Sequence, residues 1–213
     1  SDADLWKYIQ EANVGWKAPI GKGVLFQAGI FLSPIGPETI PIKDNWNWSR
    51  SDLFFGLPTY HTGIRASYDF GNGLVATVAG YNGWNSVVDD NDEKSVSASV
   101  AYKRGIFTGQ LLYFGGVERP TGAPEGPYWR SDFDGYAQLD FTSRFSMLFH
   151  ASSGFEPNRF GTDGWVAGAV SARVKLAAWL YFAARGDAFY ESVPAGASAI
   201  FWPRLAKART HSP

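Results

Sequence analysis

The chain has 213 residues, with 19 Lys and Arg against 20 Asp and Glu, which gives a formal net charge of −1. This balance provides no strong field for nucleic acid or an anionic surface, so we expect no nucleic-acid partner. Aromatic residues make up 16% of the chain and charged residues 18%, a composition too apolar for a disordered protein. Cysteine is absent, which excludes disulfides, thiolate metal sites and Cys nucleophiles.

The longest apolar stretch covers residues 176–184, far short of the roughly 18 residues that a membrane helix needs. The first four residues, Ser-Asp-Ala-Asp, carry no basic and apolar signal region. We therefore expect that a leader was removed or that the chain starts inside a longer gene product.

Alternation of apolar and polar residues recurs along almost the whole chain and predicts about ten strands. The clearest case is the segment 128–141, where Trp129 and Phe133 fall on one face while Arg130, Asp132 and Asp134 fall on the other. In chain order, the predicted strands are 5–18, 23–32, 58–70, 73–82, 94–103, 106–115, 128–141, 145–153, 164–174 and 177–190. The strands 73–82, 106–115 and 164–174 are less clean, because small or apolar residues occupy both faces.

The connections between these strands alternate in length. Short links fall at 20–22, 71–73, 104–105, 142–144 and around Lys175, and long ones cover 33–57, 83–93, 116–127 and 154–163. An up-and-down membrane barrel has short turns at the end that faces a confined compartment and long loops at the other end. A Greek-key sandwich does not call for this alternation of short and long connections.

Aromatic residues gather at both ends of the predicted strands, which fits two interfacial belts around a membrane barrel. Beside the short links lie Trp16, Tyr68, Phe70, Tyr102, Phe107, Phe141 and Phe145. Beside the long loops lie Tyr81, Trp84, Tyr113, Tyr128, Trp129, Phe155, Trp165 and Tyr190. The alternative is that aromatic residues simply favour strands and cap the core of a sandwich.

If the aliphatic face meets lipid, the polar face must line a water-filled lumen. The charged candidates for this lining are Lys7, Glu11, Lys17, Arg65, Asp69, Lys103, Arg130, Asp132, Asp134, Asp140, Arg173, Arg185 and Asp187. Seven are positive and six are negative, so the sequence predicts no ion preference. An ordinary solvated sheet face is the alternative for any one of them.

The connection 33–57 is long enough to suggest a functional loop. We hypothesise that it enters the lumen and narrows it, although an exposed extracellular loop is the alternative. Its charged constriction candidates are Glu38, Lys43, Asp44, Arg50 and Asp52.

Three further groups of residues give weaker indications of a functional site. The acidic run 89–93 lacks the spacing and the Gly of a calcium loop and is read as a solvated loop tip. His150 and Ser152 share one strand face, a pairing that an outer-membrane lipase would use, but no Gly-x-Ser-x-Gly elbow supports it. The three His residues have no ligand spacing, so we expect no metal site.

Several short motifs resemble the OmpL-like β-barrel porin-2 family of Gram-negative bacteria. They are Phe-Leu-Ser-Pro-Ile-Gly at 31–36, Asn-Trp-Ser-Arg-Ser at 47–51, Tyr-His-Thr-Gly-Ile-Arg-Ala-Ser-Tyr at 60–68, Tyr-Asn-Gly-Trp-Asn at 81–85, Arg-Gly-Asp at 185–187 and Ser-Ala-Ile-Phe-Trp-Pro at 198–203. The resemblance spans about residues 5 to 203 and implies an outer-membrane channel without a cofactor or catalytic site. Compared with the family, strands are missing at both ends, and the basic tail 204–213 resembles a truncated or frame-shifted end.

These observations predict an all-β protein, an antiparallel up-and-down transmembrane β-barrel with about ten strands present, as an incomplete segment of a larger barrel. We expect residues 1–203 to form the barrel segment and 204–213 a basic tail without strand structure. The expected function is passive diffusion of small hydrophilic solutes across the cell outer membrane, with outer-membrane lipid as a partner, homo-oligomers possible, and no enzyme activity. The alternatives are a soluble β-sandwich or jelly roll that binds carbohydrate through Trp and Tyr and, behind it, an outer-membrane lipase.

Overall fold

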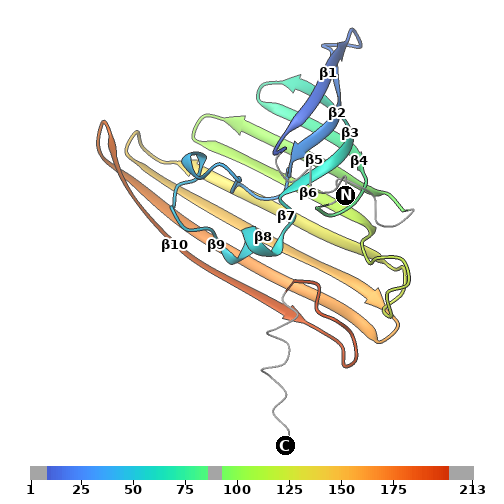
Figure 1. Cartoon of the computed structure of the whole chain (residues 1–213). Coiled ribbons are helices and arrows are strands. Elements are labelled where there is room, and N and C mark those ends of the chain that lie inside the picture. Colours follow the sequence, from blue (N-terminus) through green and yellow to red (C-terminus); the bar gives the residue numbers. More distant parts are fainter. Residues whose placement is uncertain (1–8, 86–92, 202–213) are drawn as a thin grey trace, which may run out of the picture.

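The structure is a computed structural model that describes residues 9–85 and 93–201, and it consists of one ten-stranded sheet (Figure 1). The strands are β1 (Ala12–Ala18), β2 (Val24–Leu32), β3 (Tyr60–Gly71), β4 (Leu74–Tyr81), β5 (Ser95–Arg104), β6 (Phe107–Val117), β7 (Trp129–Asp140), β8 (Phe145–Asn158), β9 (Gly161–Ala177) and β10 (Leu180–Ser192). Each strand pairs antiparallel with its neighbours in the chain. The predicted all-β, up-and-down order is confirmed.

The sheet is strongly twisted and is not closed. Figure 1 shows β1 to β4 at a steep angle to β7 to β10, as expected when right-handed strand twist accumulates over many strands. Among the described residues, β1 and β10 are the two edges and do not pair with each other. None of the helices in these residues is long and apolar enough to cross a membrane.

Cross-strand register gives the sheet two chemically different faces. Directly paired residues share a face, and one such row runs Trp16, Phe26, Ala66, Val78, Ala98, Tyr113 and Phe133. On this apolar face, which we call the outer face, large side chains stay exposed: Leu111 is 74% exposed and Val14 72%. No described segment covers the outer face. The opposite face carries the charged residues and is called the polar face.

The prediction of a long loop at 154–163 was wrong. Strand β8 continues to Asn158 and β9 begins at Gly161, so only two residues connect them. Glu156 pairs with Asp163 and Pro157 with Thr162 in register. The sequence here is rich in Gly and contains a Pro, which is typical of loops, but strand pairing across the hairpin overrides these preferences.

Strand β1 is also shorter than predicted. It begins at Ala12, and the preceding described residues 9–11 are outside it. The rest of the predicted strand, 5–8, lies outside the described residues, as do the acidic residues 89–92 and the tail 204–213.

Three aromatic residues assigned to the belt beside the long loops do not lie on the outer face. Tyr81 is only 2% exposed and Trp165 4%, and both lie on the polar face. Trp84 packs on the same side of the sheet, against a cluster of buried hydrophobic residues that includes Tyr81. Among the other predicted belt residues, Trp129, Phe155 and Tyr190 point outward and are exposed. Because β4 and β9 carry small or apolar residues on both faces, the sequence pattern did not show to which face Tyr81 and Trp165 point.

Candidate functional site

The polar face brings together charged residues from six strands, β1, β3, β5, β7, β9 and β10. By register, the residues that the sequence selects share this face: Lys17, Arg65, Asp69, Lys103, Arg130, Asp132, Asp134, Asp140, Arg173, Arg185 and Asp187. Glu11, just before β1, accepts a hydrogen bond from the Asn13 side chain on the edge strand. Lys7 lies outside the described residues.

The connection between β2 and β3, residues 33–59, lies across the polar face and is called the internal segment. Figure 1 shows it crossing in front of β7 to β10, with a 3-10 turn η1 (Ile42–Asp44) and a short helix α2 (Asp52–Gly56). Ser51 caps α2 by accepting the Phe54 N–H. The backbone N–H of Ser33 donates to Thr59 O at 2.9 Å, which closes the neck of the segment.

Arg185 of β10 anchors the middle of the internal segment. Its guanidinium lies 3.2 Å from a Glu38 carboxylate oxygen and donates to Ser49 O at 2.7 Å. It also pairs with Asp187 at 2.7 Å, and Asp187 in turn accepts the N–H of Asp52 at 2.8 Å. The planar, multi-donor guanidinium suits such a junction, because it can hold several oxygen atoms at once.

Asp134 of β7 anchors the first turn of the segment. One of its carboxylate oxygens accepts the Gly36 N–H at 2.9 Å, and the other lies 2.7 Å from His150 Nε2. Nearby, the Gln110 side chain donates to Pro34 O at 2.6 Å. Gly36 has a φ of +73° and a Cβ there would meet the His150 ring at 2.7 Å, so only Gly fits this close approach.

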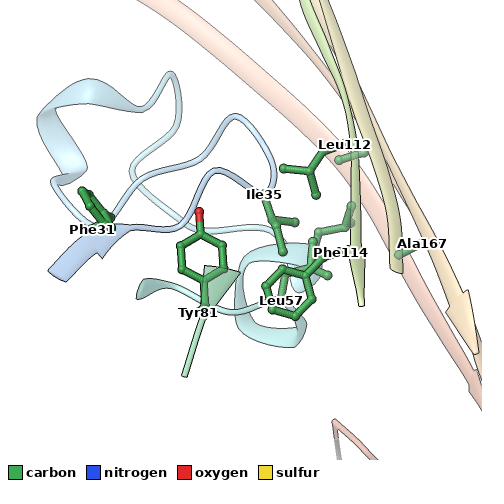
Figure 2. Packing of buried hydrophobic residues seen from close by; sticks show 9 residues of the cluster. Phe31, Ile35, Leu57, Tyr81, Leu112, Phe114 and Ala167 are labelled. Atoms are coloured by element: carbon green, nitrogen blue, oxygen red, sulfur yellow. The ribbon is translucent and has the colours of Figure 1, made fainter. Parts of the chain in front are cut away.

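An apolar cluster lies between the internal segment and the polar face. Figure 2 shows Ile35 and Leu57 of the segment beside Leu112 and Phe114 of β6. The buried members are Phe31, Ile35, Leu53, Leu57, Tyr81, Leu112, Phe114, Ala167 and Ala169. Burial of these side chains stabilises the seated segment. The sequence signal was present: β4, β6 and β9 are the strands on which alternation is least clean.

The five constriction candidates separate into two groups. Glu38 reaches Arg185 and the backbone of Asp52 reaches Asp187, so both contact the strands. Arg50 instead donates to the carbonyls of Thr39 and Ile40 and lies over the Phe54 ring, which holds the segment together internally. Lys43 and Asp44 pair with each other at 2.9 Å and are exposed.

The end of the sheet that carries the long loops has an ion-pair network that sequence reasoning missed. Glu156 contacts Arg119 at 2.6 Å and Arg130 at 2.7 Å. Arg119 also lies 3.9 Å from Glu125, whose carboxylate accepts the Ser198 N–H at 2.7 Å. The network connects the loop after β6, the hairpin of β8 and β9, and the segment after β10.

His150 and Ser152 do not form the pair that a serine hydrolase requires. His150 pairs with Asp134, whereas Ser152 donates to Asp132 at 3.0 Å and accepts from Trp165 Nε1 at 3.2 Å. A base that activates a nucleophile must be within hydrogen-bond reach of it. In the part of the chain that the structure describes, no group of three or more His, Asp or Glu could hold a metal ion.

The comparison with protein families decides the class of the chain. The family model described as "Putative beta-barrel porin-2, OmpL-like" matches residues 1–200. The chain belongs to this porin family. The family is consistent with the ten-stranded meander and its two-faced strands, and porins of this kind are generally not enzymes. No curated protein matches the chain, and no solved structure matches it either.

Proposed function

We propose that the chain works in the outer membrane of Gram-negative bacteria as part of a channel for passive diffusion of small hydrophilic solutes. The observation that carries the proposal is the contrast between the two faces of one sheet. The outer face exposes a continuous apolar surface, and the polar face holds charged residues beneath a segment of the same chain. An apolar exterior around a polar interior is the pattern of membrane barrels.

In this proposal, outer-membrane lipid covers the outer face and the charged residues of the polar face line the path of the solute. The internal segment narrows that path, because it is held on the face by Arg185, Asp134 and the apolar cluster rather than extending away from it. Solutes are then sorted by size and by the local field, without bond-making chemistry.

The direct experiment is reconstitution of the whole chain in liposomes and planar bilayers. We expect discrete conductance steps and swelling of liposomes in small sugars but not in large oligosaccharides. Cell fractionation should place the protein in the outer membrane, with detergent required for extraction. A protein that stays in aqueous buffer and binds carbohydrate would overturn the channel proposal in favour of the soluble alternative.

Replacement of Ser152 by Ala separates the channel from the lipase alternative. The Ser152 hydroxyl is hydrogen-bonded to Asp132 and Trp165. We therefore expect Ser152→Ala to keep the wild-type conductance, and we expect the wild type to show no ester hydrolysis that this variant lacks. Ester hydrolysis that disappears in Ser152→Ala would contradict this expectation.

A further inference from the structure

The end of the sheet that carries the short turns holds a local excess of positive charge. Its cationic residues are Lys17, Lys22, Lys103, Arg104, Arg144, Arg173 and Lys175, and its acidic residues are Asp69 and Asp140. Seven cations and two acids give five net positive charges at this end, and one of the seven, Arg104, lies on the outer face. Because the whole chain has a formal net charge of −1, the rest of the chain carries six net negative charges. The short-turn end is therefore strongly cationic in a nearly neutral protein.

Ion pairs hold part of the charge elsewhere on the polar face. Toward the other end, Glu156 pairs with Arg119 and Arg130, and Arg185 pairs with Glu38 and Asp187, although acidic residues outnumber basic ones there. At the short-turn end, Lys17 and Lys103 are exposed, and the Asp140 carboxylate interacts electrostatically with two cations, Arg173 and Lys103, so positive charge stays in excess. Unpaired charges project a field into the solvent, whereas paired charges largely cancel.

The cations of the polar face lie where a solute would pass. By register Lys17, Lys103 and Arg173 share this face. The Arg173 guanidinium lies 4.3 Å from the centre of the Trp46 ring, so the internal segment extends to this end of the path. Lipid reaches the outer face only, so these side chains cannot serve as headgroup contacts while the polar face is wet.

We propose that the short-turn end of the polar face is a cationic vestibule that makes the channel selective for anions. The inference rests on the proposed channel function and adds the class of solute that it favours, small inorganic or carboxylate anions. The cationic side chains raise the local concentration of anions at the mouth and deplete cations there. The effect is strongest at low ionic strength, where screening is weak.

Lys103 and Arg104 provide a matched pair of variants, because adjacent residues of β5 point to opposite faces. The whole chain is reconstituted in planar bilayers under a KCl gradient, and the reversal potential gives the chloride-to-potassium permeability ratio. We expect a ratio above one for the wild type, a fall of about twofold in Lys103→Glu, and a further fall when Lys17→Glu is added. Arg104→Glu changes the charge by the same amount at the same depth and should leave the ratio nearly unchanged.

The outcomes separate this inference from the function on which it rests. The vestibule would be overturned, and the channel left intact, if the wild type conducts with a chloride-to-potassium permeability ratio of one or below. The same conclusion would follow if Lys103→Glu and Arg104→Glu change this ratio equally. Absence of any conductance would overturn both. If the permeability ratio does not change in Lys103→Glu and the thermal stability of the protein depends on anionic lipid, the cations contact lipid headgroups and the vestibule is rejected.

Discussion

Asp134 and His150 face each other across strands β7 and β8, with His150 Nε2 lying 2.7 Å from Asp134 Oδ2. The second oxygen of the same carboxylate accepts the Gly36 N–H at 2.9 Å. One carboxylate therefore joins the wall of the sheet to the internal segment that lies across it.

Replacement of Asp134 by Ala should loosen the internal segment. The change removes both hydrogen bonds and leaves a His150 nitrogen without its partner, which should lower stability by about 1.5–3 kcal/mol. Limited proteolysis of the reconstituted protein should then show faster cleavage within residues 33–59. The control is Asp69→Ala, because Asp69 accepts a hydrogen bond from the nearby Gly71 N–H at the exposed turn, away from the internal segment. Equal cleavage of the two variants would reject the anchoring role of Asp134.

Replacement of Arg185 by Ala should free the middle of the same segment. Glu38 and Asp187 then lose their shared cation, at a cost of about 3 kcal/mol. Single-channel conductance should rise, because the segment no longer narrows the path. Arg185→Lys keeps the charge but cannot reproduce the guanidinium geometry, so an intermediate conductance is expected. An unchanged conductance in Arg185→Ala, with Arg104→Ala as the reference, would show that the segment does not limit the pore.

A charge placed on the outer face should destabilise the protein in a bilayer. Val100 lies near the middle of β5 and is 49% exposed, so Val100→Lys puts an ammonium group into hydrocarbon at a cost of about 2–4 kcal/mol. The neighbouring Ser99→Lys puts the same group on the polar face and should cost much less. Urea unfolding in lipid vesicles measures both, and similar losses of stability would contradict the assignment of faces.

The loop network around Glu125 should make one part of the protein sensitive to acid. Burial of Glu125 raises its pKa, but the N–H of Ser198 and the nearby Arg119 guanidinium lower it more, and the net shift is downward from 4.5. A depressed pKa in the folded state contributes stability above the ordinary value of 4.5 that is lost as the pH falls below it. Hydrogen exchange in residues 118–128 should therefore accelerate below about pH 4.5 in the wild type.

Glu125→Gln supplies the control for this pH dependence. Without a titrating carboxylate at this position, exchange in the same loop should be faster at neutral pH and less dependent on acid. A wild-type loop whose exchange follows only the intrinsic acid dependence of amides would show that Glu125 does not hold it.

The strands and their two faces could be predicted from the sequence because alternation is a local property. Once Arg130, Asp132 and Asp134 are placed on one face, the face of every neighbour in β7 follows from strand geometry. Trp165 and Tyr81 were assigned to the wrong face because the alternation in their strands is weak. Their strands carry small or apolar residues on both faces, so an aromatic ring there can pack inward as well as outward.

The seating of the internal segment could not be predicted in detail. Its contacts join residues far apart in the chain, such as Glu38 with Arg185, and no local pattern specifies which strand a 27-residue connection will meet. The motif Phe-Leu-Ser-Pro-Ile-Gly gave a hint, since its Gly36 has a positive φ and lies close to His150. The network of Arg119, Glu125 and Glu156 was hidden because each residue looks like an ordinary solvated charge when read singly.

The central claim, that hydrocarbon covers one face of the sheet and water the other, can be measured at two adjacent residues. The chain has no natural cysteine, so Val78→Cys and Thr77→Cys each give one site for a spin label. Val78 lies on the outer face and is 59% exposed, whereas Thr77 bonds Ser67 on the polar face. In reconstituted membranes, we expect the label at 78 to be accessible to oxygen and shielded from a water-soluble nickel complex, and the label at 77 to show the reverse. The same accessibility at both positions would contradict the account.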